Sequence, residues 1–85
     1  MFYADNYCSY TEDADPHVYT FTGPCIRTRE MQTVTIPASE LYAYRQGKLI
    51  QVAMPSVSKT DREFLVSGMS VKAWNQMFGG EHDQN

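Results

Sequence analysis

Two runs of alternating side chains, with a Gly-Pro break after the first, constrain this chain more than any other feature. From His17 to Thr22, and again from Met31 to Ile36, β-branched and aromatic residues alternate with the period of two that is typical of β-strands. The connection from Gly23 to Glu30 is long for a tight turn, so the runs predict a hairpin with an extended loop. Because a two-stranded hairpin is not stable alone in water, helices must cover its apolar face.

Helix signals follow the second strand. Pro37 ends that strand, Ser39 is positioned to cap a helix, and Gly47 is positioned to end it. The apolar run from Leu49 to Met54 indicates one or two further helical turns.

Two better-defined helices are expected in the last third of the chain. Ser58 with Asp61 three positions later is typical of a capped helix start, and Gly68 ends this helix. Ser70 can cap a last helix, which the glycine pair 79–80 terminates. Its apolar face comprises Val71, Trp74, Met77 and Phe78.

The expected fold class is therefore α+β, with an antiparallel hairpin of two strands, or of three if another strand adds, packed on about three short helices. A chain of 85 residues is too short for two cores. We expect an acidic aromatic arm at 1–16, one domain at 17–80 and a polar tail at 81–85. The predicted core comprises Val18 or Tyr19, Phe21, Val34, Ile36, Leu41, Leu49, Ile50, Val52, Met54, Phe64, Leu65, Trp74 and Phe78.

Charge is distributed unevenly along the chain, whose formal net charge is -3. Residues 1–26 sum to -4 and contain no Lys or Arg, residues 27–80 sum to +3, and the tail 81–85 sums to -2. The acidity thus belongs to the two ends, and the middle is mildly basic.

The front segment is aromatic as well as acidic, and we interpret 9–16 within it as a loop because turn formers precede Pro16. Such a segment can be a solvated edge, or it can dock on a basic, apolar surface of another molecule. On the second interpretation the protein-binding residues are Tyr3, Tyr7, Tyr10, Glu12, Asp13 and Asp15.

Several function classes are disfavoured by composition. No apolar run approaches the roughly 18 residues of a membrane span, and the first ten residues do not resemble a signal peptide, so we expect a soluble protein. Metal and catalytic sites are not expected, because Cys8, Cys25, His17 and His82 are scattered and no C-x-x-C pair is present. A solvent-exposed loop also gives no reason for carboxylates such as Asp13 to shift their pKa.

The two cysteines leave one covalent alternative open. Cys8 and Cys25 could form a disulfide across 16 intervening residues, which would contribute about 3 kcal/mol in the chain-entropy model. Without a signal peptide, two reduced thiols are the default expectation.

Nucleic-acid binding is the alternative that the basic middle allows. Arg27, Arg29, Arg45 and Lys48 could form a small basic patch. On an acidic protein such a patch would bind weakly and with strong salt dependence, so nucleic acid is not the expected partner.

Part of the sequence is similar to a family of small uncharacterised proteins encoded by bacteriophages. The resemblance covers roughly the last 55 residues before the tail. It rests on Thr33–Pro37, Leu41–Gly47, Gln51, Met54-Pro55, Ser58, Asp61–Leu65, Ser67-Gly68, Ser70, Trp74 and Phe78. Some relatives carry cysteine pairs that would form a zinc knuckle in the hairpin, whereas this chain has only Cys25 in that region, so the resemblance implies no metal here.

From the resemblance and the front segment together we expect a non-enzymatic phage accessory protein without a cofactor. It would bind a host or viral protein in the host bacterial cytoplasm and could inhibit it. A minor structural part of the virus particle is another open function. A homodimer is compatible with an exposed edge strand and exposed tyrosines.

Overall fold

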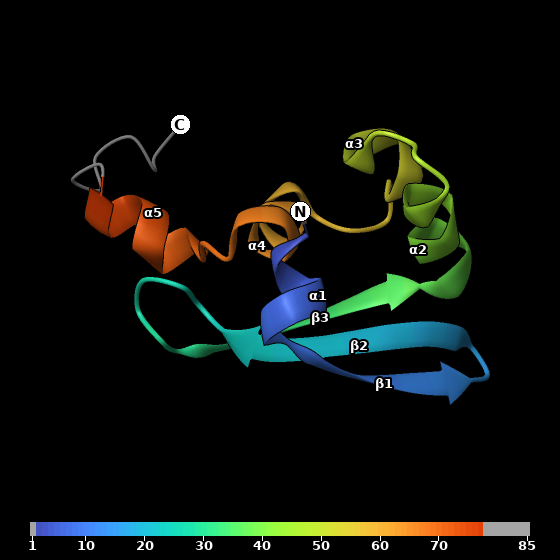
Figure 1. The fold of residues 1–85 in the computed structure, drawn as a ribbon, viewed down its shortest axis with the longest axis horizontal. Coiled ribbons are helices and arrows are strands. Elements are labelled where there is room, and N and C mark those ends of the chain that lie inside the picture. The colour runs from blue at the N-terminus through green and yellow to red at the C-terminus, as the bar shows by residue number, and fades with distance from the viewer. Residues whose placement is uncertain (1, 78–85) are drawn as a thin grey trace.

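The computed structural model describes residues 2–77, which fold into a three-stranded antiparallel sheet with five helices (Figure 1). The elements are α1 (Tyr3–Tyr7), β1 (Ser9–Ala14), β2 (His17–Pro24), β3 (Met31–Pro37), α2 (Ala38–Arg45), α3 (Ile50–Ala53), α4 (Lys59–Ser67) and α5 (Val71–Met77). The α+β fold class predicted from the sequence is confirmed, with the sheet in its three-stranded form. The predicted positions of Phe78, the glycine pair 79–80 and the tail 81–85 lie outside the described residues.

The sheet has the order β1-β2-β3, and both hairpins are antiparallel. The interpretation of 9–16 as a loop was wrong, because its first six residues form β1 and pair with β2 from Ser9 opposite Thr22 to Ala14 opposite His17. Glu, Asp and Ala have low strand propensity, so local sequence favours a loop here. The neighbouring strand β2 supplies the hydrogen-bonding partner that overrides this preference.

The two faces of the sheet differ in chemistry. Phe21, Val34 and Ile36 point to the helices and are buried. On the opposite face, the hydroxyls of Thr20 and Thr35 lie 3.2 Å apart. This alternation of buried apolar and solvated polar residues is the pattern that identified β2 and β3 in the sequence.

Helix α1, which the sequence did not reveal, anchors the front of the chain in the core. Phe2 and Tyr3 are only 5% and 8% exposed. The Tyr3 hydroxyl donates a 2.7 Å hydrogen bond to the carbonyl of Pro24, and its ring lies 5.8 Å from that of Phe64 in α4. A Cβ on Gly68 would lie 2.7 Å from the Tyr3 ring, so glycine is required there for close packing as well as for its φ of 82°. Phe2, Tyr3 and Ala4 are thus part of the packed core.

Most of the predicted core is buried. Phe21, Val34, Ile36, Leu41, Met54, Phe64 and Leu65 are buried, and Tyr19, Ile50 and Trp74 are half-buried. Leu49 and Val52 were predicted wrongly, because they are 67% and 61% exposed. The single turn of α3 directs its small residue Ala53 inward instead. Core residues not predicted are Phe2, Tyr3, Ala4, Cys25, Ala53, Val57 and Ala73.

Within residues 2–77, four of the five predicted helix-terminal signals are observed, including Gly68, whose left-handed φ of 82° ends α4. The Ser58 hydroxyl accepts the amide of Asp61 at the start of α4, and the Ser70 hydroxyl accepts the amide of Ala73 in α5. Gly47 has a left-handed φ of 103° after α2. The Ser39 cap was wrong, because α2 begins one residue earlier and has no side-chain cap.

We expect Ser58→Ala to lower the free energy of unfolding by about 1 kcal/mol, because an amide at the start of α4 loses its acceptor. Ser39→Ala is the matched control, since the Ser39 hydroxyl caps nothing and alanine is a good helix former. Urea denaturation of both variants measures the difference. Equal losses would contradict the assigned cap.

We expect Tyr3→Ala to cost about 3–5 kcal/mol, a large part of the roughly 5–15 kcal/mol that stabilises a small domain. Tyr7→Ala is the matched control in the same helix; its side chain is 63% exposed and stacks on Tyr3, so about 1 kcal/mol or less is expected. Thermal unfolding followed by circular dichroism compares them. A similar loss in both variants would show that α1 is not anchored through Tyr3.

Candidate protein-binding surface

Strand β1 forms one outer edge of the sheet and carries the acidic residues Glu12 and Asp13. All six of its residues are exposed, and it pairs with β2 alone among the described strands. Tyr10 lies opposite Phe21, and Glu12 lies opposite Tyr19. The pairing therefore holds a strand of acidic and aromatic residues in a fixed conformation at the surface.

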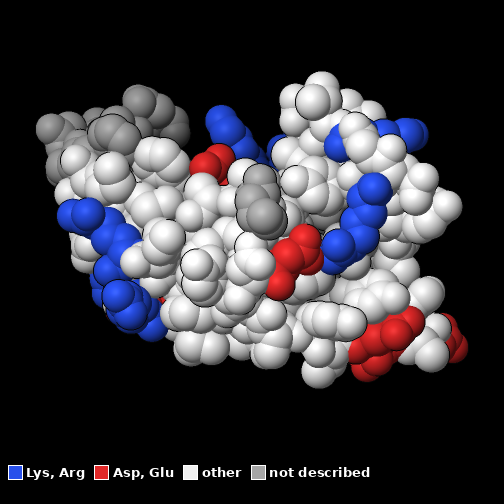
Figure 2. Space-filling model, viewed as in Figure 1, with Lys and Arg blue, Asp and Glu red and all other residues white. Residues whose placement is uncertain are grey.

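Three of the four acidic residues of the front segment, Glu12, Asp13 and Asp15, lie in or next to the turn between β1 and β2, whereas Asp5 lies in α1. Figure 2 shows acidic side chains at the lower right, where Figure 1 places this turn. The Glu12 carboxylate lies 2.6 Å from Nε2 of His17 across the hairpin. Asp13 and Asp15 have no ion pair within the described residues. Two carboxylates are thus available to a cation from outside the chain.

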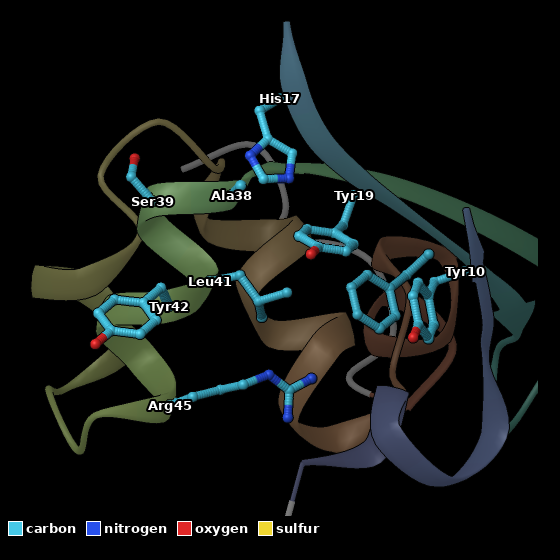
Figure 3. Close-up of a pocket in the computed structure, with 9 residues that line it drawn as sticks. Tyr10, His17, Tyr19, Ala38, Ser39, Leu41, Tyr42 and Arg45 are labelled. Carbon is cyan, nitrogen blue, oxygen red and sulfur yellow. The ribbon is translucent and has the colours of Figure 1, made fainter. Parts of the chain in front are cut away.

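An open hollow of about 690 Å³ lies beside this strand, between the sheet and α2 (Figure 3). Its lining comprises Tyr10, His17, Tyr19, Phe21, Ala38, Ser39, Leu41, Tyr42 and Arg45. The Tyr10 ring centroid lies 5.8 Å from that of Tyr19 and 5.5 Å from that of Phe21. The sheet wall of the hollow is therefore a continuous aromatic surface.

Helix α2, which forms the other wall of the hollow, is joined to α1 by an ion pair. Arg45 donates to the Asp5 carboxylate of α1 at 2.8 and 3.5 Å, which connects the last turn of α2 to the front helix. Tyr42, one turn earlier, is 66% exposed. An exposed aromatic ring beside a paired guanidinium is typical of residues that contribute strongly to protein interfaces.

The hydroxyl of Tyr19 stays protonated over the physiological pH range. Desolvation raises its pKa above 10.0, and the neighbouring Glu12 carboxylate raises it further. Tyr19 can therefore present a neutral hydroxyl, which is able to donate a hydrogen bond, at the hollow.

The six residues predicted to bind protein fall into two groups. Tyr10, Glu12, Asp13 and Asp15 share the β1–β2 hairpin. Tyr3 and Tyr7 lie on α1, with their rings stacked 4.8 Å apart. They line a separate hollow of about 230 Å³ with Pro24, Cys25, Ile26 and Arg29. Because Tyr3 is buried, the structure leaves five of the six side chains exposed.

Sequence reasoning missed the residues that complete the hollow. Tyr19 and Tyr42 were interpreted only as strand and helix residues, while His17 was considered only for a metal or catalytic site and Arg45 only for a basic patch. The available signal was the alternation within β1, where Tyr10 and Glu12 fall on one face and Thr11 and Asp13 on the other. Recognition of that strand would have placed Tyr10 beside Tyr19.

Cys25 forms a second polar cluster on the far side of the fold. Its sulfur accepts the Ser70 hydroxyl at 3.3 Å and the amides of Arg27 and Thr28 at 3.4 Å. Burial raises the pKa of this thiol, but the hydrogen bonds from Ser70 and Thr28 outweigh burial and lower the pKa from 9.0 to about 6. Cys8 and Cys25 are both free thiols, and desolvation raises the pKa of Cys8.

The basic residues considered for nucleic-acid binding do not form one patch. Arg27 and Arg29 lie in the loop between β2 and β3, at the end of the sheet opposite α2 (Figure 1). Arg45 ends α2 and is paired with Asp5, and Lys48 follows that helix.

Within residues 2–77, no cluster of three or more His, Cys, Asp or Glu side chains could hold a metal ion.

No protein-family model matches this chain, and no curated protein or solved structure is significantly similar to it. Across the described part of the chain, every helix is too short or too polar to span a bilayer.

We expect the Cys25 thiolate to make stability depend on pH. The pKa is lower in the folded state, about 6, than the 9.0 of a free thiol, so the thiolate's contribution is fully present above pH 9 and is lost as the pH falls through 6. The difference in unfolding free energy between the natural chain and Cys25→Ala should therefore increase from pH 6 to pH 9.

Urea denaturation at several pH values measures this increase, and Cys8→Ala is the matched control. Because burial raises the pKa of Cys8 above 9.0 in the folded state, any effect of Cys8 on the pH dependence of stability falls above pH 9.0. A constant difference for Cys25→Ala across the window would contradict the hydrogen-bonded thiolate.

Proposed function

We propose that this chain is a small non-enzymatic accessory protein that binds another protein through the acidic-aromatic surface. We define that surface as Tyr10, Glu12, Asp13 and Asp15 of the hairpin, with Tyr19, Tyr42 and the rest of the hollow beside them. The partner is a host or viral protein, and occupation of its basic surface can inhibit it. The bacteriophage origin and host cytoplasmic location follow from the sequence resemblance.

The observation that supports this proposal is that the β1–β2 hairpin carries both unpaired carboxylates and one wall of an exposed aromatic hollow. Tyr10 is 61% exposed and Tyr42 is 66% exposed, so two large rings lie in solvent within one concave surface. Asp13, on the other face of β1, and Asp15, in the adjoining turn, belong to the same hairpin and have no cationic partner among the described residues. Aromatic side chains in a concavity supply affinity, and peripheral charge supplies specificity and association rate.

A binding role is better supported than catalysis by the arrangement of groups. Among the described residues, the thiol with the lowered pKa is fully buried and has Ser70 as its hydroxyl partner. His17, with its Glu12 partner, lies on the other hairpin. A nucleophile and a base within hydrogen-bonding reach of each other are what covalent catalysis requires, and these two groups belong to different clusters.

We expect the double variant Asp13→Lys/Asp15→Lys to lose most of the captured partner. Tagged chain is expressed in phage-infected bacteria, recovered by affinity and analysed by quantitative mass spectrometry. Reversal of two rim charges should lower partner recovery by about tenfold or more, since like charges across an interface repel. Both residues are exposed, so the fold should be retained.

The matched control is Glu63→Lys, which reverses an exposed acid on α4 away from the hairpin. It should recover the partner at the natural level. Equal recovery by all variants would refute the assignment of the binding surface to the hairpin. Deletion of residues 1–16 is a poor substitute, because it also removes the buried side chains of Phe2 and Tyr3.

A further inference from the structure

We propose that β1 binds a basic, extended segment of a partner protein as an additional antiparallel or parallel strand of the sheet. This inference rests on the proposed protein-binding function and specifies its mode. The segment would alternate apolar or aromatic residues with Lys or Arg. The chain would thus recognise a strand, and not a helix or a folded surface.

The first observation is the unpaired edge. Strand β1 is outermost in the order β1-β2-β3, and its six residues Ser9–Ala14 are all exposed. A strand uses alternate backbone amides and carbonyls for each of its two neighbours, so the side of β1 away from β2 has backbone groups without a strand partner in residues 2–77. These groups are the ordinary template for strand addition by a peptide.

The second observation is charge, which decides between a basic segment and a second copy of the chain. β1 contains Glu12 and Asp13, and Asp15 follows in the turn, whereas Lys and Arg are absent from residues 1–26. Pairing β1 with its own copy would bring acids close to acids, which destabilises cross-strand pairs. A segment with Lys or Arg would instead neutralise Asp13 and Asp15, which have no cationic partner within residues 2–77.

The third observation is the alternation of the two faces of β1, which predicts the order of residues in the segment. Tyr10 faces α2 and lines the hollow (Figure 3). Residues of the added strand on that side would contact the Tyr10 ring and border the hollow, so apolar or aromatic side chains are favoured there. Thr11 and Asp13 face the opposite side, where Thr11 lies opposite Thr20, so basic side chains are favoured on that face.

The other edge of the sheet lacks this selectivity. Strand β3 (Met31–Pro37) contains no charged residue and continues directly into α2. It therefore offers no acidic partner for a basic segment. In the binding experiment, β3 is the edge strand with which β1 is compared.

The test uses a synthetic heptapeptide in which lysine alternates with valine, with one central phenylalanine in place of a valine. Its binding to the full, isotope-labelled chain is followed by nuclear magnetic resonance and by fluorescence anisotropy. We expect amide shifts concentrated in Ser9–Ala14. We also expect affinity at least about tenfold higher than for the same peptide with glutamate in place of lysine.

Two matched sets of peptides test backbone pairing itself. N-methylation of every second residue in one register should abolish binding, and N-methylation in the other register should leave binding intact, because only alternate amides of an added strand face β1. In the protein, Asp13→Lys should weaken binding of the lysine peptide about tenfold, and the control Glu63→Lys should leave it unchanged.

Three results would overturn the inference: shifts that map to β3 or to the helices, equal affinity for the lysine and glutamate peptides, or equal effects of the two N-methylation registers. Its failure is distinguishable from failure of the proposed function. If Asp13→Lys/Asp15→Lys abolishes partner capture while the lysine peptide does not bind β1, the surface binds protein by another mode. If capture is unaffected by those substitutions, the proposed function itself fails.

Discussion

The burial of Phe2 and Tyr3 beneath the helices is the interaction on which the rest of the fold depends. The Phe2 ring centroid lies 6.4 Å from that of Phe21 in the sheet and 4.9 Å from that of Tyr44 in α2, while Tyr3 contacts Phe64 in α4. Two consecutive side chains thus join the sheet to both halves of the helical layer. Because the same segment leads directly into β1, the anchoring of α1 also fixes where the acidic strand begins.

Presentation of the candidate surface follows from this anchoring. Strand β1 is paired on one side and begins from a helix held in the core, so its acids and Tyr10 keep a defined register relative to Tyr19 and Phe21. The Asp5–Arg45 ion pair joins α1 to α2, the opposite wall of the hollow. A surface preorganised in this way loses less conformational entropy on binding than a free acidic arm would.

The sequence was sufficient for elements whose local signals agree with their tertiary environment. Helix α4 has a serine cap, an amphipathic middle and a terminal glycine, and strands β2 and β3 alternate cleanly. Strand β1 was missed, because its acids disfavour a strand locally, its alternation is weak beside that preference, and its pairing with β2 stabilises it. For the same reason only part of the candidate site was predicted. Tyr10 and the acids were proposed from the sequence, but the position of Tyr10 beside Tyr19 in the hollow depends on the pairing of β1 with β2.

The packing of Tyr3 against Gly68 has a consequence for how the chain is made. These residues are separated by most of the sequence, and α1 has its aromatic partner Phe64 in α4. The β1–β2 and β2–β3 hairpins connect neighbouring segments and can form early, but α1 has no complete binding site until α4 has left the ribosome. Phe2 and Tyr3 are therefore covered late, and the fold closes only after α4 has emerged.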